Sequence, residues 1–531
     1  MEKIRERFKQ SRSSSREKVK LRKRSSVLYS TDDIQANSHG SVGVGIIVFT
    51  VGFRLLNCLL VQTSFVPDEY WQSLEISHRM VFNYGYETWE WKTGIRGYSY
   101  PLVFALMYKL LHLINYDTVQ LLVFVPRVFQ ALLSAYVDVT LYRLILQWDT
   151  PDVAKWTFFC QLCSWFTWFC CTRTLTNTME TVLTTLALCF YPLPGSKMHN
   201  SWKYLSLVSL AVVVRPTALI VWIPLLFCHL CWEQNKIKFI ALQCLPIAAF
   251  TLGISTLIDS VFYGKWTFVQ WNFLKLNVLQ NIAEVYGTHP WHWYVSQGLL
   301  VVIGPHLPFF IHGYSLSTKK HRILLITIIW TTVIYSLLAH KEFRFIYPLL
   351  PFCVIFCGMS LAKLQTWRKP AAVVLLVSNL IPALYTGLIH QRGTLDVMSD
   401  LQRLCDFNRS QTKPDVLFLM PCHSTPLYSH LHCPLKLRFL ECPPDLTGNK
   451  HYVDEADMFF NDPMHWLKSF SSQQMLPTHL VMFDSLEKEI STFLLENRYA
   501  KQAEIFHTHF PEGRVGENIF IYVRGPEMST D

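Results

Sequence analysis

Long apolar runs, separated by short polar connections, dominate the chain between residues 43 and 390. Each run approaches the ~17–25 residues that cross a bilayer as a helix, so together they predict about eleven spans. The expected spans are 43–62, 99–116, 119–147, 156–171, 177–193, 203–231, 236–257, 292–316, 323–338, 346–362 and 371–390. After residue 391 the runs are short and alternating, as in "HLVMF" and "NIFIYV", which is typical of strands. The pattern predicts an α-helical polytopic membrane protein whose residues 391–531 form an α/β-like region outside the bilayer.

The composition agrees with a membrane protein. Of the 531 residues, 51% are hydrophobic and 16% are charged, against about a quarter charged in average proteins. The net charge of +10 is concentrated at the start, where residues 1–30 hold 11 Lys and Arg against three Glu. We predict that residues 1–42 form a disordered basic arm in the cytosol. Its position beside a span favours contact with anionic lipid over nucleic acid, and no cleavable signal peptide is recognisable.

The basic segments also predict an orientation. A cytosolic arm places the loop 64–98 after the first span on the far, lumenal side. The short basic loops 317–322 and 363–369 should be cytosolic, which places residues 340–344 and the tail after residue 390 in the lumen. The sequon at Asn408 agrees, because N-glycosylation occurs there. Two charged loops and the tail are therefore expected on one face.

Fifteen cysteines show no disulfide-scaffold spacing. Eleven lie at or before Cys357, mostly in apolar runs, where cysteine behaves as a small hydrophobe. The group Cys160, Cys163, Cys170 and Cys171 has no accompanying His or carboxylate, so packing is favoured over metal binding. The other four lie in the tail and could pair in an oxidising compartment, with the pairing left open; they are Cys405, Cys422, Cys433 and Cys442.

The loop 64–98 opens with two adjacent carboxylates, Asp68 and Glu69, in "VPDEYWQ". Pro67 can start a helix and so aim the side chains that follow it. A carboxylate beside low-dielectric lipid is a candidate general base. The alternative to a functional site is a solvated loop. The tryptophans of the loop 64–98 would then form part of an aromatic belt at the membrane interface.

The segment "HKEFR" places His340, Lys341 and Arg344 in a loop predicted to be lumenal. The positive-inside rule disfavours cations there, which indicates that they bind an anion, and phosphate suits Lys and Arg. Glu342 could pair with one of them. The alternative is a connection whose cations extend towards the membrane surface.

Charged residues also occur inside predicted spans. Arg215 requires either a buried ion pair or an anionic ligand, and Arg127 and Asp138 could pair with each other.

Another polar group, Arg173, Asn177 and Glu180, has the spacing of one helical face and should line a cavity. The predicted span count places this face on the cytosolic side, so contact with a lumenal ligand would require re-entrant helices.

His289 and His292, in "YGTHPWHWY", are three residues apart. Two such histidines could bind metal, but no third ligand is evident, so substrate contact or interface packing is favoured. Phosphate-loop, dinucleotide-binding, zinc-protease and nucleophile-elbow motifs are absent from the sequence.

Taken together, "VPDEYWQSLEISHRMVFNYGYETWEW", "RGYSYP", "TRTLTNTMET", "YGTHPWHWY" and "HKEFRFIYPLLPF" resemble the dolichol-phosphate-mannose-dependent α-mannosyltransferases. These are multispan enzymes of the endoplasmic reticulum with the GT-C fold. The resemblance covers residues 43–390, which it implies are the catalytic transmembrane domain. Two stretches, "NYGYETWEWKTGIRGYSYP" and "YGTHPWHWYVSQG", are most similar to the branch that adds the third, α1,2-linked mannose to glycosylphosphatidylinositol (GPI) precursors.

The resemblance implies an inverting mechanism with one base. Asp68 would deprotonate the 2-hydroxyl of the second mannose, supported by Glu69. The donor phosphate would contact His340, Lys341, Arg344 and Arg215. Other substrate contacts would come from Trp71, Trp89, Glu90, Arg96, Arg173, Asn177, Glu180, His289 and His292. The partners implied are a lipid-linked donor and a glycolipid acceptor; no cofactor or metal site is expected, and a need for divalent metal stays open. Val66 departs from relatives that carry His at this position.

Two alternatives compete with this interpretation. One is a sister mannosyltransferase that acts on the dolichol-linked N-glycan precursor or adds the fourth GPI mannose. The other is a lipid transporter or flippase, which would predict internal repeats and polar groups near the membrane midplane. The sequence shows no repeat, and its charged motifs are expected at one face.

Overall fold

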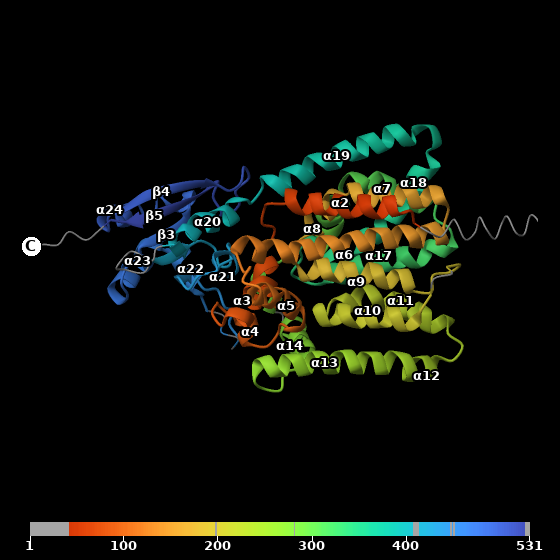
Figure 1. The fold of residues 1–531 in the computed structure, drawn as a ribbon, viewed down its shortest axis with the longest axis horizontal. Helices are drawn as coiled ribbons and strands as arrows, with labels where there is room; N and C mark the ends of the chain where they lie inside the picture. Colours follow the sequence, from red (N-terminus) through yellow and green to blue (C-terminus); the bar gives the residue numbers. More distant parts are fainter. Residues whose placement is uncertain are drawn as a thin grey trace, which may run out of the picture.

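The computed structural model describes residues 42–525, except 197–198, 281, 407–413, 447–448 and 450–451. The predicted basic arm, apart from Val42, and the predicted glycosylation site Asn408 lie outside the described residues. The described chain forms a long bundle of helices with a smaller α/β domain at one end (Figure 1). We call the end of the bundle that faces this domain the domain end; the described chain begins at the opposite end (Figure 1).

Within the described residues, the chain passes along the bundle eleven times. The passes are α2 (Val44–Leu60), α6 (Val119–Trp148), α7 (Pro151–Cys163) with α8 (Trp165–Cys170), α9 (Thr176–Phe190), α10 (Ser201–Val214), α11 (Ala218–Trp232), α12 (Lys236–Phe239) with η2 (Ile240–Cys244) and α13 (Leu245–Tyr263), η5 (Tyr294–Gly298) with α15 (Leu299–Ile303), η6 (Gly304–His306) and α16 (Leu307–Ser315), α17 (Arg322–Leu337), η8 (Phe343–Leu349) with α18 (Leu350–Lys363), and α19 (Arg368–Leu388).

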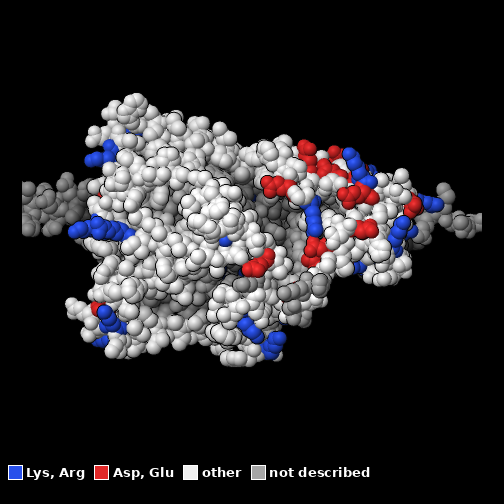
Figure 2. All heavy atoms as spheres, turned by 180° about the vertical axis from the view of Figure 1, so that it is seen from behind, with Lys and Arg blue, Asp and Glu red and all other residues white. Residues whose placement is uncertain are grey.

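The bundle has the surface of a multi-pass membrane protein. In the part of the chain that the structure describes, five continuous helical stretches are long and apolar enough to cross a membrane, and α2, α10 and α11 are shorter apolar helices. The stretch Phe343–Lys363 is central, with 89% of its apolar window buried, whereas Lys236–Tyr263 has only 11% buried and faces outwards. On the face seen in Figure 2, the middle of the bundle shows almost no charge; charged side chains, mostly Lys and Arg, lie at the far end, and both acidic and basic side chains lie toward the C-terminal domain. A middle band almost without charge fits the hydrocarbon core of a bilayer.

One predicted span, 99–116, does not cross the bundle. It contains α5 (Ser99–Leu113), and the chain on both sides of this helix contacts the domain end. The backbone N–H of Tyr98 donates to Asp259 at the end of α13 (2.7 Å), and Asp117 lies 3.7 Å from His432 of the C-terminal domain. Figure 1 shows α5 beside the loop helices, next to the C-terminal domain.

Another predicted span, 203–231, is a hairpin of two passes. α10 and α11 run antiparallel, because Tyr204 near the start of α10 is hydrogen-bonded to His229 near the end of α11. The chain turns at Arg215, whose backbone is extended, and Pro216 follows, which disfavours a helical conformation at Arg215. The two errors offset each other, so the predicted count of eleven stands.

The loss of the crossing at 99–116 changes the side on which the next motif lies. The prediction that residues 173–180 lie opposite the loop 64–98 is wrong, because Arg173 is bonded to Glu69 of that loop (2.8 Å). The charged loops 64–98 and 340–344 and the motif at Arg173 therefore meet at the domain end, and no re-entrant helix is needed.

Two long connections cover the domain end. The first contains η1 (Tyr70–Leu74), α3 (Glu75–Phe82) and α4 (Trp89–Lys92), which precede α5. The second contains α14 (Val269–Leu274), η3 (Lys275–Leu279) and η4 (Ile282–Tyr286).

The C-terminal domain is built on a five-stranded sheet of order β2-β1-β3-β5-β4. β1 (Asp415–Leu419) pairs in parallel with β2 (Lys436–Phe439) and β3 (His479–Phe483), while β5 (Asn518–Arg524) runs antiparallel to β3 and to β4 (Tyr499–Phe506). The predicted strands "HLVMF" and "NIFIYV" fall in β3 and β5. The helical elements after residue 391 are α20 (Gly393–Gln402), η10 (Arg403–Asp406), α21 (Tyr428–Leu431), α22 (Glu455–Asn461), α23 (Pro463–Gln473), η11 (Asp484–Leu486) and α24 (Ser491–Glu496).

The sheet and the first long connection share one hydrophobic core. Phe418 and Val481 on one sheet face pack in the same cluster as Tyr70, Trp71 and Leu74. The four cysteines of the tail form two disulfides, Cys405–Cys433 and Cys422–Cys442, as expected for an oxidising compartment. The domain is therefore packed against the candidate catalytic loop.

Candidate functional site

Asp68 lies at the first turn of a helix at the domain end. The helix starts after Pro67, whose carbonyl accepts from the backbone N–H groups of Tyr70 and Trp71. This is the helix start that proline was predicted to set. The Asp68 side chain keeps 27% of its surface accessible, so it can meet a substrate.

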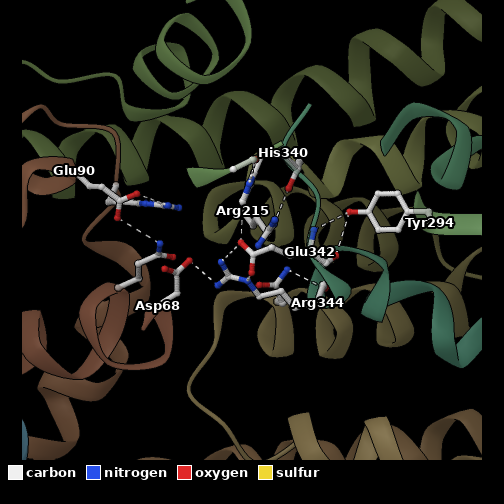
Figure 3. Close-up of polar contacts among 12 residues, drawn as sticks. Asp68, Glu90, Arg215, Tyr294, His340, Glu342 and Arg344 are labelled. Carbon is white, nitrogen blue, oxygen red and sulfur yellow. Dashed lines mark hydrogen bonds and ion pairs between the residues drawn. The ribbon is translucent and has the colours of Figure 1, made fainter. Parts of the chain in front are cut away.

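Arg344 joins Asp68 to Glu342 in one network (Figure 3). Nη1 of Arg344 donates to Oδ2 of Asp68 (2.6 Å), while its Nε and Nη2 donate to the two oxygens of Glu342 (2.7 and 2.6 Å). Arg344 is almost fully buried, and the fork-to-fork contact with Glu342 fixes the plane of its guanidinium. Burial alone would raise the pKa of Glu342, but Arg344 and His340 hold it well below its usual range.

His340 continues this network. Its Nε2 contacts Glu342 (3.0 Å) and its Nδ1 contacts the carbonyl of Gly287 (3.0 Å). Both partners offer oxygen atoms to the ring nitrogens. Arg344 therefore lies between Asp68 and Glu342, and the ring of His340 contacts Glu342.

Lys341, which the sequence assigned to the donor phosphate, is turned away from this network. Its buried ammonium donates to the carbonyl oxygens of His289 (2.9 Å), Leu338 and Ala339 (3.4 Å). These bonds use all three protons of the ammonium to hold two loops together.

Arg215 lies at the turn between α10 and α11 and enters the site beside His340 and Glu342 (Figure 3). Its Nε donates to Thr217 (2.7 Å) and lies 3.3 Å from the carboxylate of Glu180, and its guanidinium stacks over Phe345. Glu180 is fully buried, so this ion pair compensates its charge. The structure shows the ion pair that was one of the two interpretations of Arg215, and contact with an anionic ligand stays a prediction.

Glu69 does not face the same way as Asp68. It is buried and pairs with Arg173 (2.8 Å), whose other protons bond to Thr63 and to the carbonyl of Phe169. Asn177 donates to the carbonyl of Arg344 (3.2 Å). Glu69, Arg173 and Asn177 therefore brace the segments that carry Asp68 and Arg344.

The loop residues predicted to bind substrate fall into two groups. Trp71 is buried and donates to the carbonyl of Thr425 in the C-terminal domain (3.2 Å). Trp89 donates to the hydroxyl of Tyr286 (3.0 Å), and the two rings stack. Glu90 pairs with Arg96 (2.6 Å), close to the Asp68 network in Figure 3. The second group, together with the exposed Tyr286, forms a border of the site that a sugar could contact.

Sequence reasoning gave no role to Gln72 and Tyr286. Gln72 contacts Glu90 (3.4 Å) and lies four residues after Asp68, a spacing that places both on one helical face. Tyr286 opens the "YGTHPWHWY" stretch that the resemblance had already singled out, and this is the signal that could have found it.

His289 and His292 do not converge. His289 stacks on Trp293 and His292 contacts Ser296 (3.1 Å). Over the described residues, the one group of three metal-ligand side chains is Cys422, His423 and Cys442, and its two sulfurs are joined in a disulfide.

The suggested pairing of Arg127 with Asp138 is wrong. Asp138 pairs with Arg54 inside the bundle (2.7 Å), and Arg127 donates to the carbonyl oxygens of Cys58 and Val61. The partner of Asp138, Arg54, lies inside the apolar run of the first span and had no role in the sequence-based prediction.

This arrangement of helices, with a carboxylate in the first long connection, has the GT-C glycosyltransferase fold. ArnT from Cupriavidus metallidurans bound to undecaprenyl phosphate matches with a TM-score of 0.60 and 12% identity, over 92% of this chain and 100% of that chain. The oligosaccharyltransferase of Archaeoglobus fulgidus matches with a TM-score of 0.50 and 11% identity, over 91% and 74% of the two chains. These identities establish the fold alone.

The chain belongs to the Alg9-like mannosyltransferase family, whose model matches residues 45–432. It is 75% identical to GPI alpha-1,2-mannosyltransferase 3 of Danio rerio, over 99% of this chain and 98% of that protein. It is 59% identical to the Homo sapiens protein of that name, over 96% and 92% of the two chains. The resemblance seen in the motifs is thereby confirmed, and the match continues past residue 390 into the C-terminal domain.

Proposed function

We propose that this protein is a GPI α1,2-mannosyltransferase that adds the third mannose. It transfers mannose from dolichol-phosphate-mannose to the 2-hydroxyl of the second mannose of a GPI precursor. The names of its relatives at 75% and 59% identity support this acceptor over the N-glycan precursor and over the fourth GPI mannose. The gathering of charged motifs at one end of the bundle argues against a transporter.

The contact between Asp68 and Arg344 carries the proposed mechanism. Asp68 takes the proton of the acceptor hydroxyl, and the oxygen of this hydroxyl forms the new bond to the anomeric carbon. The bond from that carbon to the phosphate oxygen breaks on the opposite side, and its electron pair leaves on the phosphate. This displacement converts a β-linked mannosyl phosphate into an α-mannoside and needs a single base.

Arg344, His340 and Arg215 stabilise the charge that develops on the phosphate. Fixed donors aimed at a developing charge are usually the largest single contribution to catalysis. Arg344 is held in plane by Glu342, so it costs little reorganisation during the reaction. Glu90, Arg96, Trp89 and Tyr286 border the acceptor, and lipid surrounds the bundle between the two ends.

We further propose that the protein lies in the endoplasmic reticulum membrane, with its N-terminus in the cytosol and the domain end in the lumen. The connections at the far end, 317–322 and 363–369, carry Lys and Arg, as the positive-inside rule expects of cytosolic loops. The two disulfides of the C-terminal domain fit an oxidising lumen.

The proposal is tested in cells that lack the third GPI mannosyltransferase. Expression of this chain should restore surface GPI-anchored proteins, and its membranes should transfer labelled mannose from dolichol-phosphate-mannose to a GPI intermediate that ends in the second mannose. Rescue of N-glycan precursor synthesis without rescue of GPI anchoring would assign it to the sister reaction instead.

A further inference from the structure

Glu75 is a fully buried carboxylate that connects the first long connection to the C-terminal domain. Its oxygens accept from the backbone N–H groups of Leu427 (2.8 Å), Tyr428 (3.1 Å) and Ser429 (3.2 Å), and from the hydroxyl of Ser429 (2.5 Å). Burial raises the pKa of Glu75, and these four hydrogen bonds oppose the rise. All four donors come from the C-terminal domain.

Glu75 also lies on the same continuous helical segment as the proposed base, Asp68. The helix that begins at Asp68 continues as the π-helix η1, all of whose residues are buried, and η1 leads into α3 at Glu75. The wider π-helical turn is uncommon and often occurs at functional sites. A shift of Glu75 would therefore be passed along a short, packed segment to Asp68.

The same stretch of the C-terminal domain contacts η1 at two further points. The indole of Trp71 donates to the carbonyl of Thr425, and the ring of Tyr70 packs edge-on against His430 (5.2 Å between centroids). The disulfides Cys422–Cys442 and Cys405–Cys433 hold the chain on either side of residues 425–430. Residues 425–430, which contact η1, are thus restrained by a disulfide on each side.

We propose that Glu75 is a positioning residue that fixes the Asp68 helix on the C-terminal domain, so that residues 425–429 of this domain are part of the catalytic unit. The inference rests on the proposed role of Asp68. It goes beyond that role, because it assigns a task in mannosyl transfer to the C-terminal domain, which lies outside residues 43–390 and their motifs.

The test compares Glu75→Gln with two other variants of the full-length protein in membranes. Asp68→Asn removes the proposed base. Asp484→Asn is the matched control, since Asp484 also accepts from a backbone N–H, that of Asn518 (3.0 Å), but within the C-terminal domain. Two measurements are made: kcat and KM for mannose transfer, and hydrogen exchange of the amides of residues 427–429 and 68–74.

We expect Glu75→Gln to lower kcat roughly 10- to 100-fold, the range that a displacement of about 1 Å can produce, with the KM of both substrates within about twofold of normal. Its amides at 427–429 and 68–74 should exchange faster. Asp484→Asn should leave both measurements unchanged. Asp68→Asn should abolish transfer without faster exchange, which separates loss of the base from loss of its support.

Faster exchange in Glu75→Gln with an unchanged kcat would overturn the proposal, as would unchanged exchange. If Asp68→Asn is active, the proposed base is wrong, and the exchange data still show whether Glu75 joins the two parts. If Glu75→Gln does not fold, Ser429→Ala, which removes one of the four bonds, decides: a lower kcat at normal KM supports the proposal, and an unchanged kcat contradicts it.

Discussion

Arg344 donates a hydrogen bond of 2.6 Å to Asp68, although the two residues are 276 positions apart in the sequence. The proposed base and the proposed phosphate ligand are therefore in direct contact. In the proposed mechanism, the arriving donor phosphate competes with Asp68 for the same guanidinium. Binding of the donor would then free the carboxylate to accept the proton of the acceptor hydroxyl, which couples the readiness of the base to the presence of the donor.

Replacement of Asp68 by Asn should remove mannosyl transfer, since an amide cannot take the acceptor proton. A positioned general base contributes about 10²–10⁴-fold, so a loss of at least about 100-fold is expected. The measurement is transfer of labelled mannose in membranes with equal amounts of protein. Glu87→Gln is the control, because Glu87 is a partly exposed acid of the same loop that pairs with Arg79. Near-normal transfer by Asp68→Asn would defeat the mechanism.

Replacement of Glu342 by Gln should weaken the reaction through Arg344. The amide cannot accept two charge-assisted bonds, so the guanidinium loses its fixed plane beside Asp68. We expect kcat/KM for the lipid donor to fall by about 10²-fold, the lower end of what loss of one transition-state donor costs. Lys341→Met, which removes a cation next to Glu342 in the chain but outside the network, should change the KM for the donor little. A larger rise of this KM for Lys341→Met than for Glu342→Gln would reverse the assignment.

Much of the fold could be predicted from apolar runs, but α5 and the α10–α11 hairpin could not. α5 exposes Leu106, Leu110 and Leu113 while it buries Phe104 and Tyr108. A helix along a membrane surface and a helix across it can have the same apolar content, so hydropathy alone does not separate them. The hairpin had a usable signal, Arg215-Pro216 in the middle of a run too long for one span, which was interpreted as an intramembrane charge.

The residue types of the site could also be predicted, and so could the pairing of Glu342 with a cation of its own loop, whereas the partners from distant segments could not. The acidic loop and the cationic loop were correctly expected on one face. Glu69 and Asp68 are neighbours in the sequence, yet one pairs with Arg173 and the other with Arg344. Adjacent residues on a helix point in different directions, so which carboxylate faces the site depends on contacts with distant segments.

The pair of Glu69 and Arg173 is expected to stabilise the protein rather than to act on substrate. Both side chains are buried, and loss of one partner leaves the other charge unpaired, which typically costs about 3–5 kcal/mol. Glu69→Gln and Arg173→Met should each lower the melting temperature in detergent. The double variant should be less destabilised than the sum of the two. If both single variants melt normally but lose transfer, the pair belongs to the chemistry instead.

The contact between the first long connection and the C-terminal domain should weaken in acid, because His78 is buried there as a neutral ring. Its Nε2 lies 3.0 Å from Nδ1 of His432, and burial lowers the pKa of His78 from 6.5 to about 3. A histidine whose pKa is lower in the folded state contributes its full stability above pH 6.5, and that contribution is lost as the pH falls from 6.5 towards 3. Each pH unit in this window costs at most about 1.4 kcal/mol for one proton.

Thermal unfolding measured at pH 7.5, 6 and 5 should show a steeper loss of stability for the native chain than for His78→Asn, in which the titrating ring is absent. His292→Asn, at a more exposed position, serves as the control and should follow the native chain. Equal acid sensitivity of His78→Asn and the native chain would show that other groups govern the transition.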